Sequence, residues 1–476
     1  MNPNPMMTSL QQAAGWIGGA RVLGDATRAF ARVHTDSRTV APGDLFVALK
    51  GERFDAHDFL ADVVARGAAA VLVAHDVDVG VPAIVAPDTR IALGELAAGW
   101  RRGFTPPTVA VTGSNGKTTV KEMIAAIFAA AVGEADRLAT GGNLNNDIGL
   151  PLTVLRLRAH HRLAVLELGM NHPGETVYLA KIAQPTVAVI TNAQREHQEF
   201  MVSVEAVAHE HAHAIAALPA DGVAVFPLDA ASGGQHAGIW RQAAGARRVL
   251  TFGTDVGTDV GADRGTPDVT ATVALDDGVQ VLRVRAPGQQ FDVRLQLLGT
   301  HNVRNALAAT ACALAAGVEV AAIQAGLGGF SAVKGRLQVK HTPGGVVVVD
   351  DTYNANPDSV RAAIDVLAGF AAPRVLVLGD MGEVGDQGPA FHAEIGAYAR
   401  ERGIDTLWAV GELATHAVQA FGAAARHFAS AEALAQACGE DRSGTVAGAA
   451  AVLVKGSRFM RMERIVDALV ASTSVH

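Results

Sequence analysis

The stretch VTGSNGKTT, residues 111–119, carries residue types that together can bind the phosphates of a nucleotide. It follows an apolar run and opens a helical pattern, so its glycines let backbone amides approach an anion while the helix N-terminus favours negative charge. Lys117 adds a cation, and the hydroxyl of Thr118 is placed to ligate Mg²⁺. We predict that ATP phosphates bind along this phosphate loop, at Gly113, Ser114, Asn115, Gly116, Lys117, Thr118 and Thr119.

A second stretch, AHEHAH at residues 208–213, points to different chemistry. His209 and His213 lie one helical turn apart with a glutamate between them, which satisfies the H-E-x-x-H pattern of zinc peptidases. The extended form of that pattern is absent, because Ala216 stands where its glycine would be. Asp229 could still act as a third ligand, so a zinc peptidase stays open as an alternative.

Composition narrows the classes of protein to which the chain can belong. A length of 476 residues, with 49% hydrophobic and 18% charged residues, is typical of a globular protein with several domains, and we expect three. The net charge of -8 lacks a basic surplus, so no nucleic-acid partner is expected. Cys312 and Cys438 predict buried free thiols in a reducing cytoplasm. No signal-peptide pattern and no run of about 20 apolar residues is present, so membrane insertion is not expected.

Changes in the apolar pattern divide the chain into three α/β units. Residues 1–104 contain short apolar stretches separated by turn residues, which predict a small α/β N-terminal domain. The proline-marked break FTPPT begins a second unit, residues 105–334. The pattern of apolar strands restarts near residue 335, so residues 335–476 form the third unit.

The second and third units predict different sheets. Apolar runs at 163–168 and 186–191 are typical of strands buried on both faces, so the central unit should be a P-loop domain with a parallel sheet. Alternating patterns around residues 265–297 predict an antiparallel annex to this sheet. In the third unit, four apolar runs each end in polar or glycine residues. That pattern predicts a doubly wound, Rossmann-like sheet with ligands beyond the carboxyl ends of its strands.

The spacing within the phosphate loop is unusual. Gly113 and Gly116 are separated by two residues, whereas the common pattern G-x-x-x-x-G-K-[ST] has four. The shorter form T-G-x-N-G-K-T resembles the loop of the Mur ligase family. Further landmarks of that family follow in order: Glu167 in LELGMN, His197 in TNAQREH, His301, Asn302 and Asn305 in GTHNVRN, Arg336 in KGRLQ, and Asp351 in DDTYNANP.

Longer stretches are similar to one branch of the family, the ligases that add a dipeptide. They are HTDSRTVAPGDLFVALKGERFDAHDF, GGNLNNDIGLP, DDTYNANPDS, VLGDMGEVG and VLVKGSRFMRMER, and they follow the three-domain order of the family. The resemblance implies an ATP-dependent amide ligase of peptidoglycan precursor synthesis. It would join D-alanyl-D-alanine to UDP-N-acetylmuramoyl-tripeptide through an acyl phosphate. A sister ligase that adds a single amino acid and a P-loop ATPase or phosphotransferase remain alternatives.

The resemblance also implies roles for the residues of the metal and phosphate sites. Thr118 and Glu167 would hold Mg²⁺ on the ATP phosphates, and His197 would hold a second Mg²⁺ near the acceptor carboxylate. An imidazole ligand is atypical for magnesium and depends on the family analogy. Lys117, His197 and Arg336 would be the catalytic residues, with Arg336 at the γ-phosphate, because two anionic reactants need their charge neutralised.

Further roles are implied for the residues that contact adenosine and the two substrates. Asn302 and Asn305 would face adenine, and Asp351 the ribose. The other substrate-binding residues would be Ser37, Arg38, Lys50 and His57 for the UDP end, Asn145 and Asn146 for the sugar-peptide arm, and Tyr353, Asn354 and Asn356 for the dipeptide. We expect a monomer whose domains close on the substrates. Whether the tripeptide ends in diaminopimelate or lysine stays open, as does the state of domain closure.

One departure from the family falls in the helical stretch at residues 204–218. By the family's spacing, His211 stands where most relatives carry a carbamylated lysine that supports the second Mg²⁺. No lysine occurs between Lys181 and Lys334, so a carbamate cannot form there. Our hypothesis is that Glu210 or His211 supplies the compensating contact, directly or through water. The alternative is that these are surface residues of the helix and that water completes the metal site.

Overall fold

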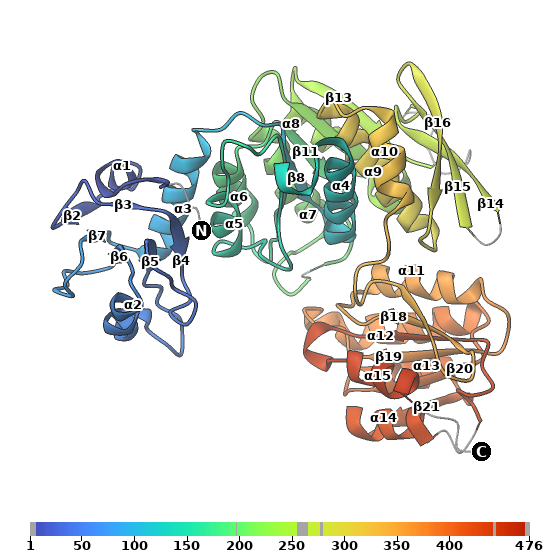
Figure 1. The fold of residues 1–476 in the computed structure, drawn as a ribbon. Coiled ribbons are helices and arrows are strands. Elements are labelled where there is room, and N and C mark those ends of the chain that lie inside the picture. The colour runs from blue at the N-terminus through green and yellow to red at the C-terminus, as the bar shows by residue number, and fades with distance from the viewer. Residues whose placement is uncertain (1–5, 197, 255–264, 277–278, 441–443, 472–476) are drawn as a thin grey trace.

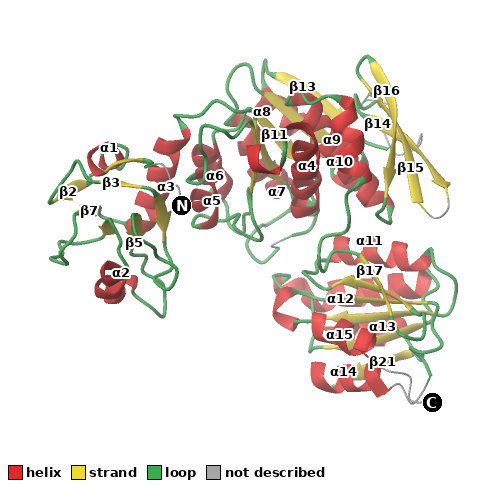
Figure 2. Cartoon of the chain, viewed as in Figure 1, coloured by secondary structure: helices red, strands yellow, loops and turns green. Residues whose placement is uncertain are grey.

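The computed structural model of the chain consists of three α/β domains, and the central domain contacts both of the others (Figures 1 and 2). It describes residues 6–196, 198–254, 265–276, 279–440 and 444–471. In Figure 1 the N-terminal domain lies to the left of the central domain and the C-terminal domain lies below it. The N-terminal and C-terminal domains therefore occupy separate sides of the central domain.

The N-terminal domain is built on a five-stranded sheet of order β2-β7-β6-β5-β4, in which only β2 runs antiparallel to its neighbour. Its elements are α1 (Leu10–Ala14), β2 (Arg21–Leu23), β4 (Arg32–His34), β5 (Asp44–Val47), α2 (Leu60–Ala65), β6 (Ala70–Val73), β7 (Ala83–Val85) and α3 (Thr89–Arg101), with a short ribbon of β1 (Thr8–Ser9) and β3 (Ala29–Phe30). Strands β5, β6 and β7 are buried along their whole length, which explains their continuous apolar sequence.

The central domain is built on a six-stranded parallel sheet of order β13-β12-β11-β8-β10-β9. Its strands are β8 (Thr108–Thr112), β9 (Arg137–Ala139), β10 (Leu163–Glu167), β11 (Val187–Ile190), β12 (Val223–Pro227) and β13 (Arg248–Phe252). Its helices are α4 (Lys117–Val132), α5 (Gly149–Val154), α6 (Glu175–Ala183), α7 (Val204–Ala216), α8 (Ala237–Ala244), α9 (Thr300–Ala315) and α10 (Val320–Gly328). The predicted parallel sheet is confirmed.

The predicted antiparallel strands form a separate three-stranded sheet of β14 (Thr270–Asp276), β15 (Val279–Ala286) and β16 (Gln289–Leu295). Their inward-facing side chains, such as Leu282 and Val293, join the same buried cluster as α4 and α9. The outward-facing residues alternate with them and are exposed, as expected for a sheet with one solvated face. This sheet therefore extends the core on one face of the central domain.

The C-terminal domain contains a second six-stranded sheet, of order β17-β18-β22-β19-β20-β21. Only β17 is antiparallel, so the predicted doubly wound sheet is confirmed with an added edge strand. The strands are β17 (Gln338–His341), β18 (Val347–Asp351), β19 (Arg374–Gly379), β20 (Thr406–Val410), β21 (Ala425–Phe428) and β22 (Ala451–Lys455). The helices are α11 (Pro357–Ala368), α12 (Gly388–Glu401), α13 (Ala414–Phe421), α14 (Ala431–Glu440) and α15 (Glu463–Ala471).

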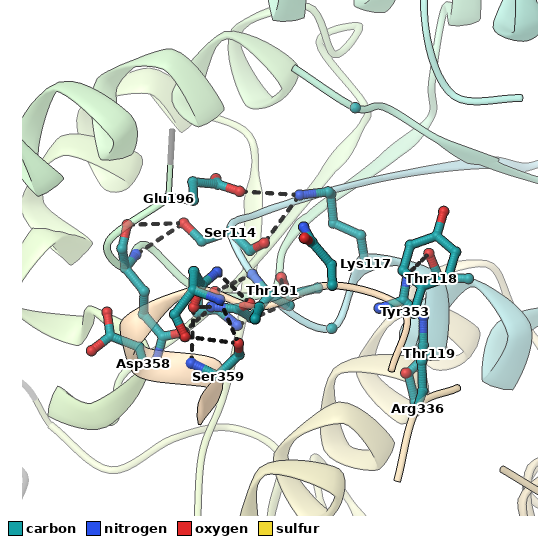
Figure 3. Close-up of a pocket in the computed structure, with 18 of the residues that line it drawn as sticks. Ser114, Lys117, Thr118, Thr119, Thr191, Glu196, Arg336, Tyr353, Asp358 and Ser359 are labelled. Atoms are coloured by element: carbon teal, nitrogen blue, oxygen red, sulfur yellow. Dashed lines mark hydrogen bonds and ion pairs between the residues drawn. The ribbon is translucent and has the colours of Figure 1, made fainter. Parts of the chain in front are cut away.

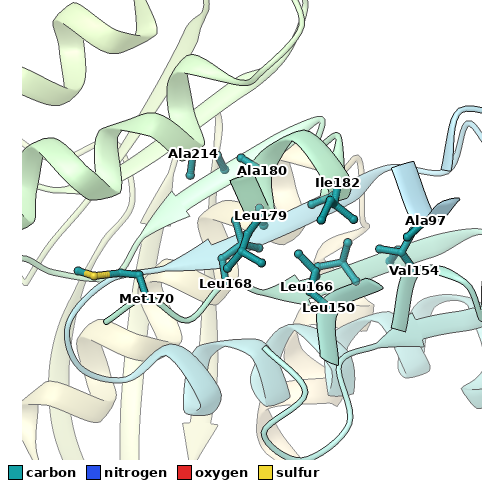
Figure 4. Packing of buried hydrophobic residues seen from close by; sticks show 14 of the residues in the cluster. Ala97, Leu150, Val154, Leu166, Leu168, Met170, Leu179, Ala180, Ile182 and Ala214 are labelled. Atoms are coloured by element: carbon teal, nitrogen blue, oxygen red, sulfur yellow. The ribbon is translucent and has the colours of Figure 1, made fainter. Parts of the chain in front are cut away.

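The buried cores connect the three domains unequally. One cluster of buried apolar residues continues from the N-terminal domain into the face of the central sheet that carries α5, α6 and α7. Figure 4 shows Ala97 of α3 beside Leu150 and Val154 of α5, close to Ile182 of α6. By contrast, the buried members of the two C-terminal clusters all lie within residues 337–469. The first two domains thus share a core, and the last domain has its own.

The cysteines and the helices bear on two predictions made from composition. Cys312 and Cys438 are both buried and neither forms a disulfide, which confirms the predicted thiols. None of the helices in the described part of the chain is long and apolar enough to cross a bilayer.

Candidate active site

A cleft of about 1250 Å³ lies where the central and C-terminal domains meet. The central domain contributes the phosphate loop, the loops after β10 and β11 and the start of α9. The C-terminal domain contributes the loops that follow β18, β19 and β22 at the carboxyl ends of those strands. Both sheets therefore present the edge at which α/β proteins bind ligands.

The phosphate loop turns tightly between β8 and α4. Gly113 and Gly116 have φ angles of 131° and 81°, which lie in the region that favours glycine. A side chain would also collide with neighbours, because a Cβ on Gly113 would lie 2.1 Å from Thr191 Oγ1 and one on Gly116 would lie 2.6 Å from Asn305 Oδ1. The backbone of Asn115 is held by Asn192, whose Oδ1 accepts from its N–H at 2.8 Å. The loop is thus a rigid turn whose glycines allow close packing.

Lys117 begins α4 and folds back over this turn. Its Nζ donates to the carbonyls of Gly113 and Ser114, the latter at 3.1 Å, and lies 3.3 Å from Glu196 Oε2 (Figure 3). The ammonium group is therefore held at the rim of the loop by oxygen atoms that a phosphate could replace.

Thr118 and Glu167 meet beside the loop, as the sequence predicts for a metal pair. Thr118 Oγ1 donates to Glu167 Oε1 at 3.1 Å, and Asn145 Nδ2 donates to the same oxygen at 2.8 Å. Glu167 Oε2 is buried and has no hydrogen-bond partner. A buried carboxylate oxygen without a partner is costly unless a cation or ligand binds it. The described residues contain no group of three or more His, Cys, Asp or Glu that could hold a metal.

These two residues fit Mg²⁺ in its usual manner. Magnesium in proteins takes oxygen ligands and is often bound by one or two carboxylates together with substrate phosphates. The hydroxyl of Thr118 and the unpartnered oxygen of Glu167 supply that chemistry next to the phosphate loop. His197, predicted as the ligand of a second Mg²⁺, lies outside the described residues.

Arg336 reaches the same place from the segment that connects the central and C-terminal domains. Its guanidinium group donates to Thr118 Oγ1 at 3.0 Å and stacks over the ring of Tyr353, 4.3 Å from the ring centroid. Its Nε is buried without a hydrogen-bond partner. The predicted residues Lys117, Thr118 and Arg336 are therefore brought together, with cationic groups directed at the cleft (Figure 3).

The residues predicted to contact adenosine line the cleft as well. Asn302 and Asn305 lie at the start of α9, where Asn305 Nδ2 donates to Asn302 Oδ1 at 3.1 Å. Asp351 ends β18 and accepts from the backbone N–H of Leu337 at 3.1 Å. It also pairs with Lys455, a buried residue of β22 that sequence reasoning missed.

The residues predicted for the dipeptide and the sugar-peptide arm also line the cleft. Tyr353, Asn354 and Asn356 lie between β18 and α11, and Asn356 caps α11 by accepting from Ser359 N at 2.8 Å. The same Asn356 exchanges hydrogen bonds of 2.9 and 3.4 Å with Asn115 of the phosphate loop. Asn145 and Asn146 lie before α5, where Asn146 Oδ1 accepts from Gly149 N at 2.9 Å.

The residues predicted for the UDP end are separate from this cleft. Ser37, Arg38, Lys50 and His57 all belong to the N-terminal domain and are not among the residues that line it. Arg38 is exposed and pairs with Asp36 at 2.8 Å. His57 Nδ1 lies 2.6 Å from Asp55 Oδ1, and His57 Nε2 accepts from the backbone N–H of Ala74 at 3.0 Å. The structure thus places these four residues on another domain, outside the cleft.

Comparison with known proteins agrees with this geometry. The family models described as Mur ligase family, catalytic domain, as Mur ligase middle domain, and as Mur ligase, glutamate ligase domain match residues 30–101, 111–313 and 335–458. The chain is 39% identical to the UDP-N-acetylmuramoyl-tripeptide--D-alanyl-D-alanine ligase of Escherichia coli (strain K12), over 96% of each chain. The chain belongs to the Mur ligase family. The ligase of the same name from Bacillus subtilis (strain 168) is 36% identical over 92% of this chain and 93% of its own length.

Solved Mur ligases have the same three-domain arrangement. MurF from Acinetobacter baumannii superposes with a TM-score of 0.87 at 36% identity, covering 98% of this chain and 99% of that one. MurF from Thermotoga maritima in complex with ADP superposes with a TM-score of 0.78 at 26% identity, covering 93% and 97%. The predicted α/β architecture and the predicted family are therefore confirmed.

The four residues His209, Glu210, His211 and His213 have different environments on α7. His209 and His213 are exposed on α7, whereas Glu210 is buried and accepts from the backbone N–H groups of Gly174 and Thr176 at 3.0 and 2.9 Å. Glu210 thus caps the start of α6 and does not face the phosphate loop. His211 is fully buried, and its Nε2 lies 3.0 Å from Oε1 of Glu196, a residue that lines the cleft. Its predicted contact with the metal site stays a prediction.

Several site residues gave no independent signal in the sequence. Arg195 and Glu196 directly precede the family landmark His197, and Asp358 directly follows the DDTYNANP motif. Arg195 forms ion pairs of 2.6 Å with Asp358 and 2.7 Å with Glu394 of α12. The sequence could point to these residues only through the motifs beside them. Arg195 and its partners Asp358 and Glu394 are more than 160 positions apart, so their ion pairs were not predicted.

Proposed function

We propose that the chain is an ATP-dependent amide ligase that joins D-alanyl-D-alanine to UDP-N-acetylmuramoyl-tripeptide in peptidoglycan precursor synthesis. Relatives with this name match nearly the whole chain, at 39% identity for the one from Escherichia coli (strain K12). The observation that carries the proposal is the position of the phosphate loop, which faces the carboxyl edge of the C-terminal sheet across one cleft. We further expect the protein to act as a monomer in the cytoplasm.

The reaction needs two steps, and the cleft has residues suited to each. The γ-phosphoryl group of ATP passes to the tripeptide carboxylate, which gives an acyl phosphate and ADP. The amine of the dipeptide then attacks the acyl carbon, phosphate leaves, the amine loses a proton and the amide bond remains. Because the first step brings two anions together, catalysis depends on positioning and on neutralising charge.

Lys117 and Arg336 supply the neutralising charge from this chain. Lys117 can exchange its contacts with Gly113 O and Ser114 O for phosphate oxygens, since the carbonyls already hold the ammonium at the loop. Arg336 lies beside Thr118 and is assigned to the γ-phosphate. Mg²⁺ bound by Thr118 and Glu167 would add positive charge at the phosphates, and His197 is assigned to a second Mg²⁺.

The remaining assignments follow the position of each residue. Asn302 and Asn305 lie at the start of α9, Asn305 next to Gly116, and are assigned to adenine, and Asp351 is assigned to the ribose. The assignments for the substrates are Asn145 and Asn146 for the sugar-peptide arm, Tyr353, Asn354 and Asn356 for the dipeptide, and Ser37, Arg38, Lys50 and His57 for the UDP end. The last four lie on a separate domain, which suits a long substrate that spans from UDP to the reacting carboxylate.

Substrate-dependent phosphate release tests this function. We expect phosphate and ADP to appear when UDP-N-acetylmuramoyl-tripeptide, D-alanyl-D-alanine, ATP and Mg²⁺ are all present. Release with a single amino acid in place of the dipeptide would instead select the sister ligase. Release with ATP alone would select an ATPase. The same assay with tripeptides ending in diaminopimelate or lysine would identify the preferred third residue.

Replacing Lys117 should have the largest effect on turnover. Lys117→Met should lower the rate of phosphate release by about 10²-fold or more, which is typical for removing one preorganised group from a charge-stabilising site. The exposed Lys181 of α6 offers a matched control, because Lys181→Met makes the same chemical change away from the cleft. Equal rates for Lys117→Met and Lys181→Met would contradict the assignment.

Replacing Glu167 should change the dependence on metal. Glu167→Gln removes the negative charge of the unpartnered oxygen, so the Mg²⁺ concentration for half-maximal rate should rise by about tenfold or more, as even indirect partners of a metal cost that much. The exposed Glu205 of α7 is the control, since Glu205→Gln changes the same charge. An unaltered Mg²⁺ titration for Glu167→Gln would remove it from the metal site.

A further inference from the structure

Behind Lys117 lies a chain of buried hydrogen-bonded residues that the assigned roles do not use. Glu196 Oε2 is 3.3 Å from Lys117 Nζ, and Glu196 Oε1 is 3.0 Å from His211 Nε2. His211 Nδ1 lies 2.9 Å from the hydroxyl of Thr112 at the end of β8. Glu196 is 5% exposed and His211 is fully buried, so solvent screens these contacts little.

The directions of these hydrogen bonds follow from the chemistry of the groups. Burial lowers the pKa of His211, so the ring is neutral and carries one N–H. A carboxylate only accepts, hence Nε2–H donates to Glu196 and Nδ1 accepts from the Thr112 hydroxyl. The neutral ring thus leaves the negative charge of Glu196 in place and fixes its orientation toward Lys117.

The backbone of this carboxylate is fixed from the other side. The neighbouring Arg195 donates its backbone N–H to Asp358 at 2.8 Å, and its guanidinium group pairs with both Asp358 and Glu394. Glu196 N also donates to Gln194 O at 3.0 Å. While the C-terminal domain is docked, these contacts hold the backbone of Glu196 beside the phosphate loop.

The buried carboxylate of Glu196 affects which nucleotides the phosphate loop can bind. Lys117 is the cation expected to meet the phosphates, and in the absence of nucleotide it is neutralised by Glu196. Phosphates that draw Lys117 away leave the Glu196 charge facing them in a site with a low effective dielectric constant, where repulsion is strong. A nucleotide that carries a divalent cation brings compensating charge, and a nucleotide without one does not.

We propose that Glu196, oriented by His211, is a specificity-determining residue that makes the phosphate loop select nucleotide complexed with a divalent cation over the free nucleotide. Glu196 holds Lys117 in the nucleotide-free protein and opposes phosphates whose charge is not compensated. His211 and Thr112 act as positioning residues for this carboxylate. The inference rests on the proposed binding of ATP at the loop. It gives a role to Glu196 and Thr112, and it gives His211 a role other than the metal contact considered from the sequence.

Titration calorimetry of ADP and of a non-hydrolysable ATP analogue, each with Mg²⁺ and with EDTA, tests the proposal. The measured quantity is the ratio of the two dissociation constants, without and with Mg²⁺. Glu196→Gln keeps the size and hydrogen-bonding shape of the side chain but removes its charge. It should strengthen binding in EDTA and reduce the ratio by about tenfold, the change expected for removing one nearby charge interaction in a poorly solvated site.

Control variants separate this effect from a general change in charge or folding. Glu199→Gln makes the same charge change three residues away at an exposed position and should leave the ratio as in the wild type. His211→Gln can still donate to Glu196 and should retain most of the ratio, whereas His211→Ala should reduce it. Thermal unfolding of each variant shows whether it is folded, and Glu196→Gln provides the test even if His211→Ala does not fold.

The outcomes distinguish this inference from the proposed function. An unchanged ratio in folded Glu196→Gln, with wild-type protein that binds nucleotide, would overturn the role of Glu196 alone. Failure of wild-type protein to bind either nucleotide under all conditions would overturn the proposed function itself. An equal reduction in Glu199→Gln would mean that net charge, not the fixed carboxylate, controls the ratio.

Discussion

The two junctions of the central domain are built from different interactions. At the junction with the N-terminal domain, apolar side chains of α3, α5 and α6 form one continuous core (Figure 4). Arg101, at the end of α3, is buried there and donates to Ala183 O and Gln184 O at 3.0 Å. At the junction with the C-terminal domain the contacts are mainly polar, with Arg195 pairing across it and Asn115 bonded to Asn356, and Leu298 packs against the C-terminal core.

This difference indicates which parts of the molecule can move. Separating the first two domains would expose a shared apolar core, at a cost of about 25 cal/mol for each Å² of apolar surface. Separating the last domain would replace partly exposed ion pairs and amide contacts with water, which costs less. The cleft lies at the second, polar junction. The cleft therefore lies between a two-domain unit with a shared core and a domain joined to it by other contacts, and we expect that last domain to open and close.

Breaking the apolar junction should produce the largest effect on stability. Arg101→Met removes a guanidinium group that donates to three carbonyls and to Thr108 Oγ1, so buried acceptors lose their partners. The free energy of unfolding should fall by about 2–4 kcal/mol. Urea unfolding followed by tryptophan fluorescence measures this, because Trp16, Trp100 and Trp240 all lie in the two-domain unit. The exposed neighbour Arg102 is the control, and a similar loss in Arg102→Met would argue against the assigned contacts.

Breaking the polar junction should leave stability nearly unchanged and alter the shape of the molecule. Arg195→Ala removes the pairs with Asp358 and Glu394, which are partly exposed and worth about 0.2–1 kcal/mol each. Together they should shift the balance of open and closed forms by about two- to thirtyfold. Small-angle X-ray scattering should then show a larger radius of gyration, and high salt should open the wild type in the same direction. Arg400→Ala on α12, an exposed control, should scatter as the wild type does.

Acid should have the smallest effect on this polar junction over the ordinary range of pH. Hydrogen bonds from Arg195 lower the pKa of Glu394, so its contribution is present above the pKa of an unfolded glutamate and is lost as pH falls through the lowered folded-state pKa. The radius of gyration of the wild type should therefore stay constant from neutral pH to about pH 5. Opening already at pH 6 would mean that another group controls this junction.

Short motifs in the sequence were enough to predict several of the residues that line the cleft. The glycines, lysine and threonine of the phosphate loop lie in one short segment, and their spacing alone identified a phosphate site with Thr118 at its metal edge. The family resemblance named Glu167, which ends a buried strand and lines the cleft, as expected for the carboxyl edge of a parallel sheet. Arg336 and Asp351 were found through their motifs, and both line the cleft.

Pairings across long distances in the sequence could not be predicted in the same way. His211 appeared as one of several similar histidines on a helix, and the residues it contacts, Thr112 and Glu196, are 99 and 15 positions away. The prediction left Glu210 and His211 as equal candidates. Burial separated them, because Glu210 faces α6 while His211 faces the phosphate loop.

The sequence by itself determined the α/β class, the phosphate loop and the family, because these depend on periodicity and on short motifs within one segment. Only the tertiary structure decided which charges meet and which domains share a core. Lys117 contacts Glu196, and Arg195 contacts Glu394, because folding brings the ends of separate strands and helices to one edge. An ion pair is a property of distance and burial in space, and neither quantity is written in the spacing of residues along the chain.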